Sequence, residues 1–165
     1  MNARLNHTSR LTIAITLAAT VLAGFALTSP LQARDDSGWL RDHTAALKQA
    51  KAKQQPVIID IYAPWCGYCR KLQREVYPAS EVRAITDKFV RVRVNGEEHR
   101  DVMRKYGVRA FPTIVFLDAN GGEIDRINGY MPAAPFARRV RDIHRKSQRE
   151  SEVLRQLKSN HESAI

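Results

Sequence analysis

Residues 57–69 read VIIDIYAPWCGYC. The first six of these residues are almost continuously apolar, which predicts a central strand covered on both faces. The triplet Ala-Pro-Trp then turns the chain, and we expect a helix from Cys66 to about Val76. The sequence therefore predicts a buried strand that leads into two cysteines at the start of a helix.

Cys66 and Cys69 are the only cysteines of the chain. A disulfide between them would close a very short loop, and the stabilisation from a disulfide grows with loop length, so a structural role is a weak explanation. Disulfide exchange instead needs a thiolate that attacks and a second thiol that releases the mixed disulfide. Because a helix start favours negative charge, we predict that Cys66 attacks and Cys69 resolves.

Two metal-binding alternatives would use the same pair. A structural zinc site needs four ligands, but the chain offers no third cysteine and no histidines at paired spacing. A module that binds Cu(I) through the two thiols, or that docks a partner without turnover, stays open because soft metals accept thiolates. Met103 and Met131 do not neighbour the motif in sequence. We predict no resident metal and no other cofactor.

The first 33 residues differ from the rest of the chain. Arg4 and Arg10 precede an uncharged stretch over residues 11–27, and a short segment ends at Ala33. This order is that of a secretory signal peptide, cleaved after Ala33. The uncharged stretch also reaches the lower end of the membrane-spanning range of about 17–25 residues, so an anchor in the inner membrane is the alternative. Either reading predicts an exported, periplasmic protein.

The chain is basic, with a formal net charge of +10. Such a charge attracts acidic proteins, anionic membranes or nucleic acids. Its basic residues are dispersed and no nucleic-acid-binding motif accompanies them, so we predict no nucleic-acid partner. We interpret the arginines as solvent-exposed faces of helices.

The chain length predicts one domain with extensions: a signal peptide over 1–33, a domain over 34–146 and a charged tail over 147–165. The periodicity and turn signals predict the elements of that domain in a fixed order. They are a helix over about 37–53 capped from residues 35–37, a strand over 57–62, helices over 66–76 and about 80–88, a strand over 89–94, a helix over 97–106, strands over 113–117 and 123–127 joined by a turn at 118–122, and a last helix from Pro132.

Alternating helices and strands that end in a hairpin predict an α/β fold, with a mixed central sheet flanked by helices and closed by a C-terminal helix. Within it, Ser80 is expected to cap its helix. The strand over 89–94 alternates, which predicts a valine face opposite a face that carries Arg91 and Arg93.

Residues 60–69, DIYAPWCGYC, followed by residues 105–113, KYGVRAFPT, resemble thioredoxins. The resemblance spans about 37–146, and its two motifs have the order and separation of that family. It implies the thioredoxin fold and thiol–disulfide oxidoreductase activity. It also implies that Pro112 is a cis-proline facing the cysteines, which leaves the backbone of Phe111 free to pair with substrate.

The resemblance implies further site residues. Asp60 occupies the position of a buried acid; burial among apolar neighbours raises the pKa of a carboxyl group, which suits Asp60 to take the proton from Cys69. The alternative is that Asp60 is a solvated residue at the end of the strand. Arg93 stands where the family often has lysine, and arginine can hold Asp60 charged but cannot pass protons. Trp65, Gly67, Tyr68 and Gly129 are the remaining positions expected to contact substrate.

The dipeptide Gly67-Tyr68 resembles that of periplasmic disulfide isomerases. The spacing of 43 residues from Cys69 to Pro112 leaves no room for the insertion of periplasmic oxidases. What remains is a monomeric domain similar to the C-terminal domain of the transmembrane electron-transfer reductase. We therefore expect reduction of disulfide-containing exported proteins, with electrons from a membrane thiol donor. An oxidase or isomerase is the alternative, because direction depends on potential and partners.

Overall fold

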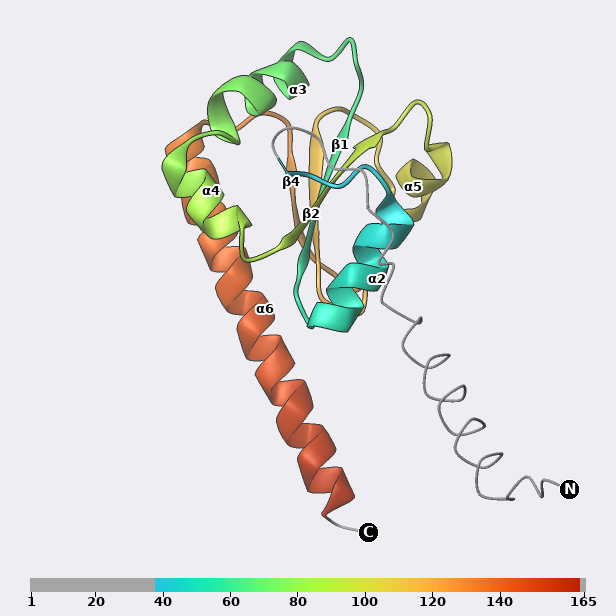
Figure 1. Ribbon diagram of the computed structural model, residues 1–165, viewed down its shortest axis with the longest axis vertical. Helices are drawn as coiled ribbons and strands as arrows, with labels where there is room; N and C mark the ends of the chain where they lie inside the picture. Colours follow the sequence, from blue (N-terminus) through green and yellow to red (C-terminus); the bar gives the residue numbers. More distant parts are fainter. Residues whose placement is uncertain (1–37, 164–165) are drawn as a thin grey trace, which may run out of the picture. The chain divides into compact units, whose positions relative to one another are not determined.

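Four strands form one mixed sheet in the computed structural model, which describes residues 38–163 (Figure 1). The strand order is β2-β1-β3-β4, with β1 parallel to β2 and antiparallel to β3. The predicted signal peptide and the capping residues expected at 35–37 lie outside the described residues. The strands are β1 Val57–Tyr62, β2 Val90–Asn95, β3 Thr113–Leu117 and β4 Glu123–Asn128.

Strand β1 is central because its apolar side chains are covered on both faces of the sheet. Val57 and Ile59 pack into one cluster, and Ile58 packs into the other. Since side chains alternate along a strand, Asp60 lies on the same face as Ile58. The parallel register places Asp60 opposite Arg93 of β2.

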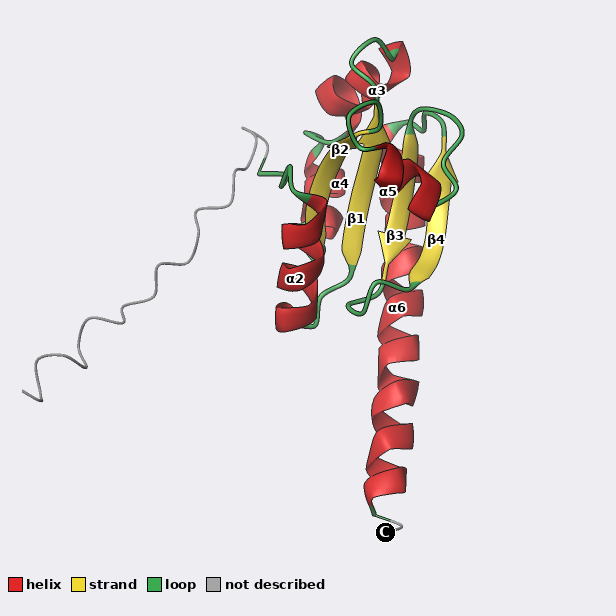
Figure 2. Cartoon of the chain, turned by 90° about the vertical axis from the view of Figure 1, so that its right-hand side faces the viewer, coloured by secondary structure: helices red, strands yellow, loops and turns green. Residues whose placement is uncertain are grey.

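Helices cover both faces of this sheet (Figure 2). The cluster on one face joins α2 and α5, and the cluster on the other joins η2, α4 and α6. These elements are α2 His43–Lys53, α3 Gly67–Lys71, the π-helix η2 Leu72–Val76, α4 Ser80–Thr86, α5 Arg100–Lys105 and α6 Ala133–Glu162. The predicted thioredoxin fold and the predicted element order are confirmed.

The expected start of the first helix is wrong. Helix α2 begins at His43, where Asp42 caps it by accepting a hydrogen bond from the backbone N–H of Ala45 at 3.0 Å. Trp39 and Leu40 precede this helix and are buried, and Leu40 forms an isolated bridge with Val92 of β2. Their apolar spacing therefore reflects packing on the sheet rather than a helix face.

One local expectation also needs correction. Ser80 does not cap α4: Ala79 occupies the capping position without a side-chain hydrogen bond, and Ser80 Oγ contacts Glu81 instead. On β2, Arg93 is only 8% accessible, which agrees with its expected place near the buried Asp60. Its burial follows from the position of Asp60 across the register.

The predicted hairpin turn at 118–122 is confirmed. Asp118 Oδ1 accepts hydrogen bonds from the backbone N–H groups of Asn120 and Gly122 at 2.8 and 2.9 Å. Gly121 has φ +92°, a value that glycine adopts without steric cost. This turn joins β3 to β4 and completes the sheet.

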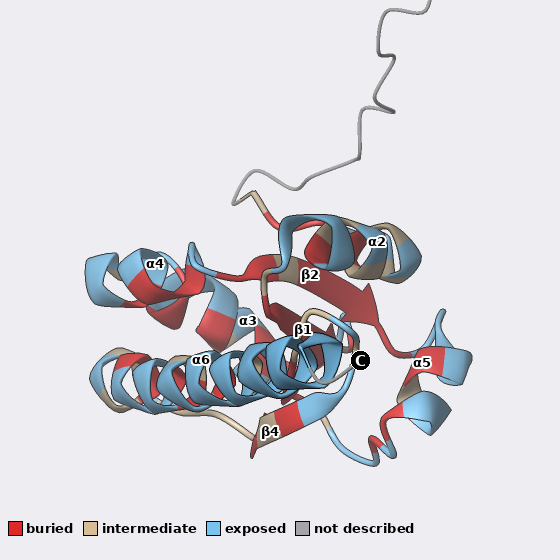
Figure 3. Ribbon diagram, turned by 90° about the horizontal axis from the view of Figure 1, so that it is seen from below, coloured by how far each residue is buried: buried red, intermediate tan, exposed pale blue. Residues whose placement is uncertain are grey.

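Helix α6 continues through most of the residues expected to form a tail. It begins after Pro132 as predicted, buries Phe136, Val140 and Ile143, and runs to Glu162 beyond the sheet (Figure 1). The part of α6 nearest the C-terminus is coloured as exposed in Figure 3. Residues 147–162 contain neither glycine nor proline, so nothing in that sequence stops the helix. Within residues 38–163, no helix combines the length and apolar character needed to cross a bilayer.

Candidate active site

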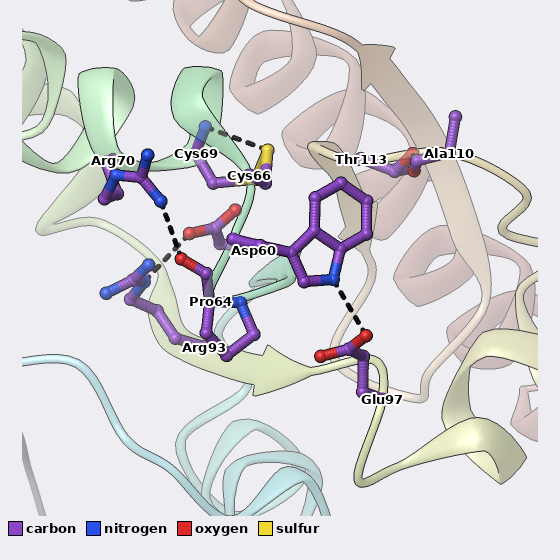
Figure 4. The surroundings of a disulfide bond; sticks show 10 residues. Asp60, Pro64, Cys66, Cys69, Arg70, Arg93, Glu97, Ala110 and Thr113 are labelled. Carbon is purple, nitrogen blue, oxygen red and sulfur yellow. Dashed lines mark hydrogen bonds and ion pairs between the residues drawn. A yellow bond between two sulfur atoms is a disulfide. The ribbon is translucent and has the colours of Figure 1, made fainter.

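A disulfide joins Cys66 and Cys69 at the point where β1 leads into α3 (Figure 4). Cys66 is the N-cap residue of α3, and its Sγ accepts a hydrogen bond from the backbone N–H of Cys69 at 3.1 Å. The two Cα atoms are 5.3 Å apart. Because an N–H group already points at the Cys66 sulfur, negative charge on that sulfur would be stabilised when the disulfide opens.

The two sulfurs differ in access. Cys66 is 5% exposed and Cys69 is 1% exposed, and both pack with Ala63 and Phe111. The helix continues past the pair as η2, whose Leu72 and Val76 are buried in the core. This anchoring fixes Cys69 in the less exposed position, which suits a resolving thiol.

Aromatic side chains lie around the disulfide on the solvent side. Tyr68 is exposed and stacks on Tyr130, with ring centroids 5.7 Å apart. Lys71 Nζ lies 4.8 Å from the centroid of the Tyr130 ring. Gly67 is exposed, and a Cβ added there would contact nothing within 4 Å. Sequence reasoning identified Tyr68 and Gly67 but missed Tyr130 and Lys71.

Trp65 is 65% exposed and is held by two contacts. Its Nε1 donates a hydrogen bond to Glu97 Oε1 at 2.8 Å, and its ring meets Phe111 edge-on at 5.9 Å. Asn95 Oδ1 in turn accepts from the backbone N–H of Glu97. Sequence reasoning missed Glu97. The available signal was its place after β2, because the ends of adjacent parallel strands meet at one edge of the sheet.

Replacing Glu97 with leucine should loosen the Trp65 ring and lower kcat/KM for disulfide reduction about two- to tenfold, which corresponds to the net free energy of one hydrogen bond. Glu97→Gln keeps an acceptor and should restore most of the loss. Iodide quenching of tryptophan fluorescence reports the ring directly, because Trp39 is buried. Identical quenching and kinetics in the leucine variant and the wild type would contradict the positioning role.

The loop before β3 forms the opposite side of the site. The Phe111–Pro112 peptide bond is cis, as expected. The carbonyl oxygen of Pro112 accepts a hydrogen bond from the backbone N–H of Gly129 at 2.8 Å. Gly129, which is expected to contact substrate, has φ +83°, a backbone conformation that glycine adopts without steric cost. Thr113 Oγ1 further fixes this loop by donating to the carbonyl oxygen of Ala110 at 2.8 Å.

Asp60 is completely buried, and the alternative of a solvated residue at a strand end is wrong. Arg93 Nε donates a hydrogen bond to Asp60 Oδ2 at 2.9 Å, and Figure 4 shows this pair in the surroundings of the disulfide. The Arg93 guanidinium also lies over the Tyr62 ring, 4.4 Å from its centroid. A buried carboxylate is therefore matched by a buried cation.

Arg93 keeps its charge in this position. Burial by itself lowers the pKa of Arg93, but the charge of Asp60 and their hydrogen bond outweigh burial and raise that pKa above its ordinary value. Tyr77 belongs to the same buried region: burial first, and then the charge of Asp60, raise the pKa of its hydroxyl well above its ordinary value. Sequence reasoning missed Tyr77, whose ring packs against Trp39 with centroids 4.9 Å apart.

Replacing Arg93 with lysine should destabilise the protein by about 1–2 kcal/mol while preserving disulfide reduction. Lysine keeps the positive charge that Asp60 requires but loses the planar contact with Tyr62. Arg93→Met should destabilise the protein considerably more, because it leaves an uncompensated buried carboxylate. Urea denaturation measures both effects. An equal loss of stability in the two variants would show that the charge at this position does not stabilise the protein.

Metal-binding side chains do not converge near the cysteines. In the described part of the chain, no three His, Cys, Asp or Glu side chains are grouped as a metal site would require.

The chain is similar in sequence to known thiol–disulfide exchange proteins. Residues 44–144 match the family model described as a thioredoxin-like domain. The thiol:disulfide interchange protein DsbD of Yersinia enterocolitica is 32% identical over 143 residues, which cover 80% of this chain and 25% of that protein. Protein disulfide-isomerase tigA of Aspergillus niger is 34% identical over 76 residues, which cover 46% of this chain and 21% of that protein. The chain thus spans about a quarter of these relatives.

Solved structures agree on the fold. A thioredoxin from Thermus thermophilus superposes with a TM-score of 0.59 at 26% identity, covering 65% of this chain and 87% of that one. An oxidoreductase named DsbH superposes with a TM-score of 0.54 at 20% identity, covering 73% of this chain and 92% of that one, which shows the fold alone.

Proposed function

The chain belongs to the thioredoxin-like domain family and is similar to thiol:disulfide interchange proteins, and from this premise we propose that it reduces disulfides of exported proteins. The observation that carries the proposal is the placement of Cys66 at the start of α3, with the N–H of Cys69 directed at its sulfur. In this proposal Cys66 is the attacking thiol and Cys69 the resolving thiol.

The reaction starts from the dithiol form of the protein. The Cys66 thiolate attacks one sulfur of a client disulfide, the client S–S bond breaks, and the departing client thiolate takes up a proton. Cys69 then loses its proton to Asp60, directly or through water, and attacks the Cys66 sulfur. The mixed disulfide breaks, and the second client sulfur leaves as a thiolate that takes up a proton. Two electrons have moved to the client, and the protein holds the Cys66–Cys69 disulfide.

The surrounding residues position the client. We propose that Trp65 and Tyr68 contact the client across the disulfide, since both are exposed there. Gly67 leaves open space beside the motif. We propose that the backbone of Phe111 pairs with the client, as the resemblance to thioredoxins implies. Gly129 fixes this loop through the carbonyl of Pro112.

Repeated turnover requires a donor that returns two electrons to the cysteine pair. We propose a membrane thiol protein for this step, supported by the similarity to DsbD proteins. We further propose that residues 1–33 direct export to the periplasm, that residues 34–146 act as a monomeric domain, and that 147–165 extend it. The mass of the protein recovered from periplasm tests cleavage after Ala33.

Insulin reduction with dithiothreitol as the electron source tests the proposal. The wild-type protein should accelerate precipitation of the insulin B chain, and added copper should not be needed. Tight Cu(I) binding without any insulin reduction would instead favour the metal-binding alternative. A variant with both cysteines replaced by serine is the matched control for background reduction.

The redox state of the pair in cells tests the direction of the reaction. If the protein works as a reductase, thiol trapping in intact cells should find Cys66 and Cys69 mostly reduced, because a donor keeps them so. A pair that is mostly oxidised would identify an oxidase. Diamide and dithiothreitol treatments of the same cells give the two reference states.

A further inference from the structure

A second feature lies beside the redox site and has no part in the exchange chemistry. It is a surface hollow of about 320 Å³ between α5 and the loop that follows it. Its apolar part is formed by Met103 and Val108, and three arginines from the helix and the loop complete it. The lining residues are Arg100, Met103, Arg104, Gly107, Val108 and Arg109, which are named below as the arginine hollow.

The three arginines lack carboxylate partners. Across residues 38–163, ion pairs engage arginines such as Arg126 and Arg139, but none engages Arg100, Arg104 or Arg109. All three are exposed, and no acidic side chain lines the hollow. Three cations around one concave surface attract an anionic group, because the repulsion among them is relieved when it binds.

One aromatic side chain, Phe111, packs near both the hollow and the disulfide. A Cβ added to Gly96 would lie 2.6 Å from the Phe111 ring and 2.8 Å from Met103 Sδ, so Phe111 and Met103 pack against the same glycine. Phe111 also packs against Cys66 and Cys69. A client chain that binds along Phe111 can therefore approach both the cysteines and the arginine hollow.

We propose that the arginine hollow binds an acidic segment of the protein whose disulfide reacts with Cys66. The inference rests on the proposed function and adds the charge of the preferred partner. An extended polypeptide can bring carboxylates to Arg100, Arg104 and Arg109 and apolar groups to Met103 and Val108 while its cysteine lies at Cys66. A free anion would use only the guanidinium groups.

Two peptides test this proposal. Each carries one disulfide, followed in one peptide by four glutamates and in the other by four glutamines. The fully reduced protein is mixed with each peptide, and single-turnover rate constants are measured by quenching with an alkylating agent. We expect the wild-type protein to react about tenfold faster with the glutamate peptide at low salt, and this preference should shrink at high salt because exposed charges are screened.

Matched variants locate the effect. R100Q/R104Q/R109Q should react with the glutamine peptide as the wild type does but lose its preference for the glutamate peptide. The control is R138Q/R141Q/R149Q, which removes the same charge from exposed positions on α6, against the opposite face of the sheet. This control should keep most of the preference for the glutamate peptide. The two variants together distinguish an effect of the hollow from an effect of net charge.

Several results would overturn the inference. One is equal rates with both peptides in the wild type, and another is the same loss of preference in both triple variants. A third is binding to vesicles containing phosphatidylglycerol that only the hollow variant loses, without any peptide preference, which would assign the hollow to a membrane. If the wild type reduces neither peptide, the proposed function itself is contradicted, and so is the inference that rests on it.

Discussion

Replacing Cys66 with serine is expected to lower disulfide reduction by roughly a thousandfold or more, whereas replacing Cys69 with serine should trap clients as mixed disulfides. The first variant lacks the attacking sulfur, and losing a nucleophile removes most of the rate acceleration. The second variant still attacks, because Cys66 remains at the start of α3 and its sulfur still accepts the hydrogen bond from the backbone N–H of residue 69. Only the resolving step is lost.

Non-reducing gels and mass spectrometry of peptide digests distinguish the two variants. The Cys69→Ser protein should carry a client joined to Cys66, and dithiothreitol should release that client. The variant that lacks both cysteines should carry none and is the control for non-covalent association. Trapping by the Cys66→Ser protein alone would mean that the two roles are reversed.

Replacing Asp60 with asparagine should slow release of the mixed disulfide about a hundredfold near neutral pH, with a much smaller effect on its formation. Formation needs only the Cys66 thiolate, which the helix start stabilises. Release needs Cys69 to lose its proton where it is nearly inaccessible to water, and a buried thiolate is costly without a nearby base. Asparagine keeps an oxygen for the hydrogen bond from Arg93 but cannot accept the proton.

Stopped-flow kinetics on a model disulfide separates the two steps of the Asp60→Asn protein. The defect should fade at alkaline pH, where Cys69 ionises without help. Asp142→Asn, at an exposed position on α6, is the matched control and should change neither step. Urea denaturation establishes that the Asp60 variant is folded. Equal slowing of both steps would show that Asp60 is structural.

The sequence was most informative where one local pattern had one explanation. The apolar runs over 57–62 and 113–117 predicted β1 and β3 with the correct bounds, because each run lies between turn signals and is too short for a helix of the core. The motif containing Cys66 and Cys69 predicted a helix start after a buried strand, and the structure has both. The roles of the individual site residues stay predictions.

Some contacts between segments that are distant along the chain could not be predicted from the sequence. Glu97 lies 32 residues from Trp65 in sequence, and only the parallel pairing of β1 and β2 brings them together. Leu40 has the spacing of a helix residue but pairs with β2, since burial against the sheet outweighs local periodicity. By contrast, the resemblance to thioredoxins did place Arg93 near Asp60, and the register of β1 and β2 puts the two residues opposite each other.

One measurement tests the central claim most directly. The fully reduced protein is mixed with one equivalent of a peptide disulfide, quenched at successive times with acid and an alkylating agent, and analysed by mass spectrometry. The account predicts that one Cys66–Cys69 disulfide forms for each peptide disulfide reduced, and that the peptide is joined only to Cys66 in between. Failure to reduce the peptide, or reduction that leaves both cysteines as thiols, would contradict it.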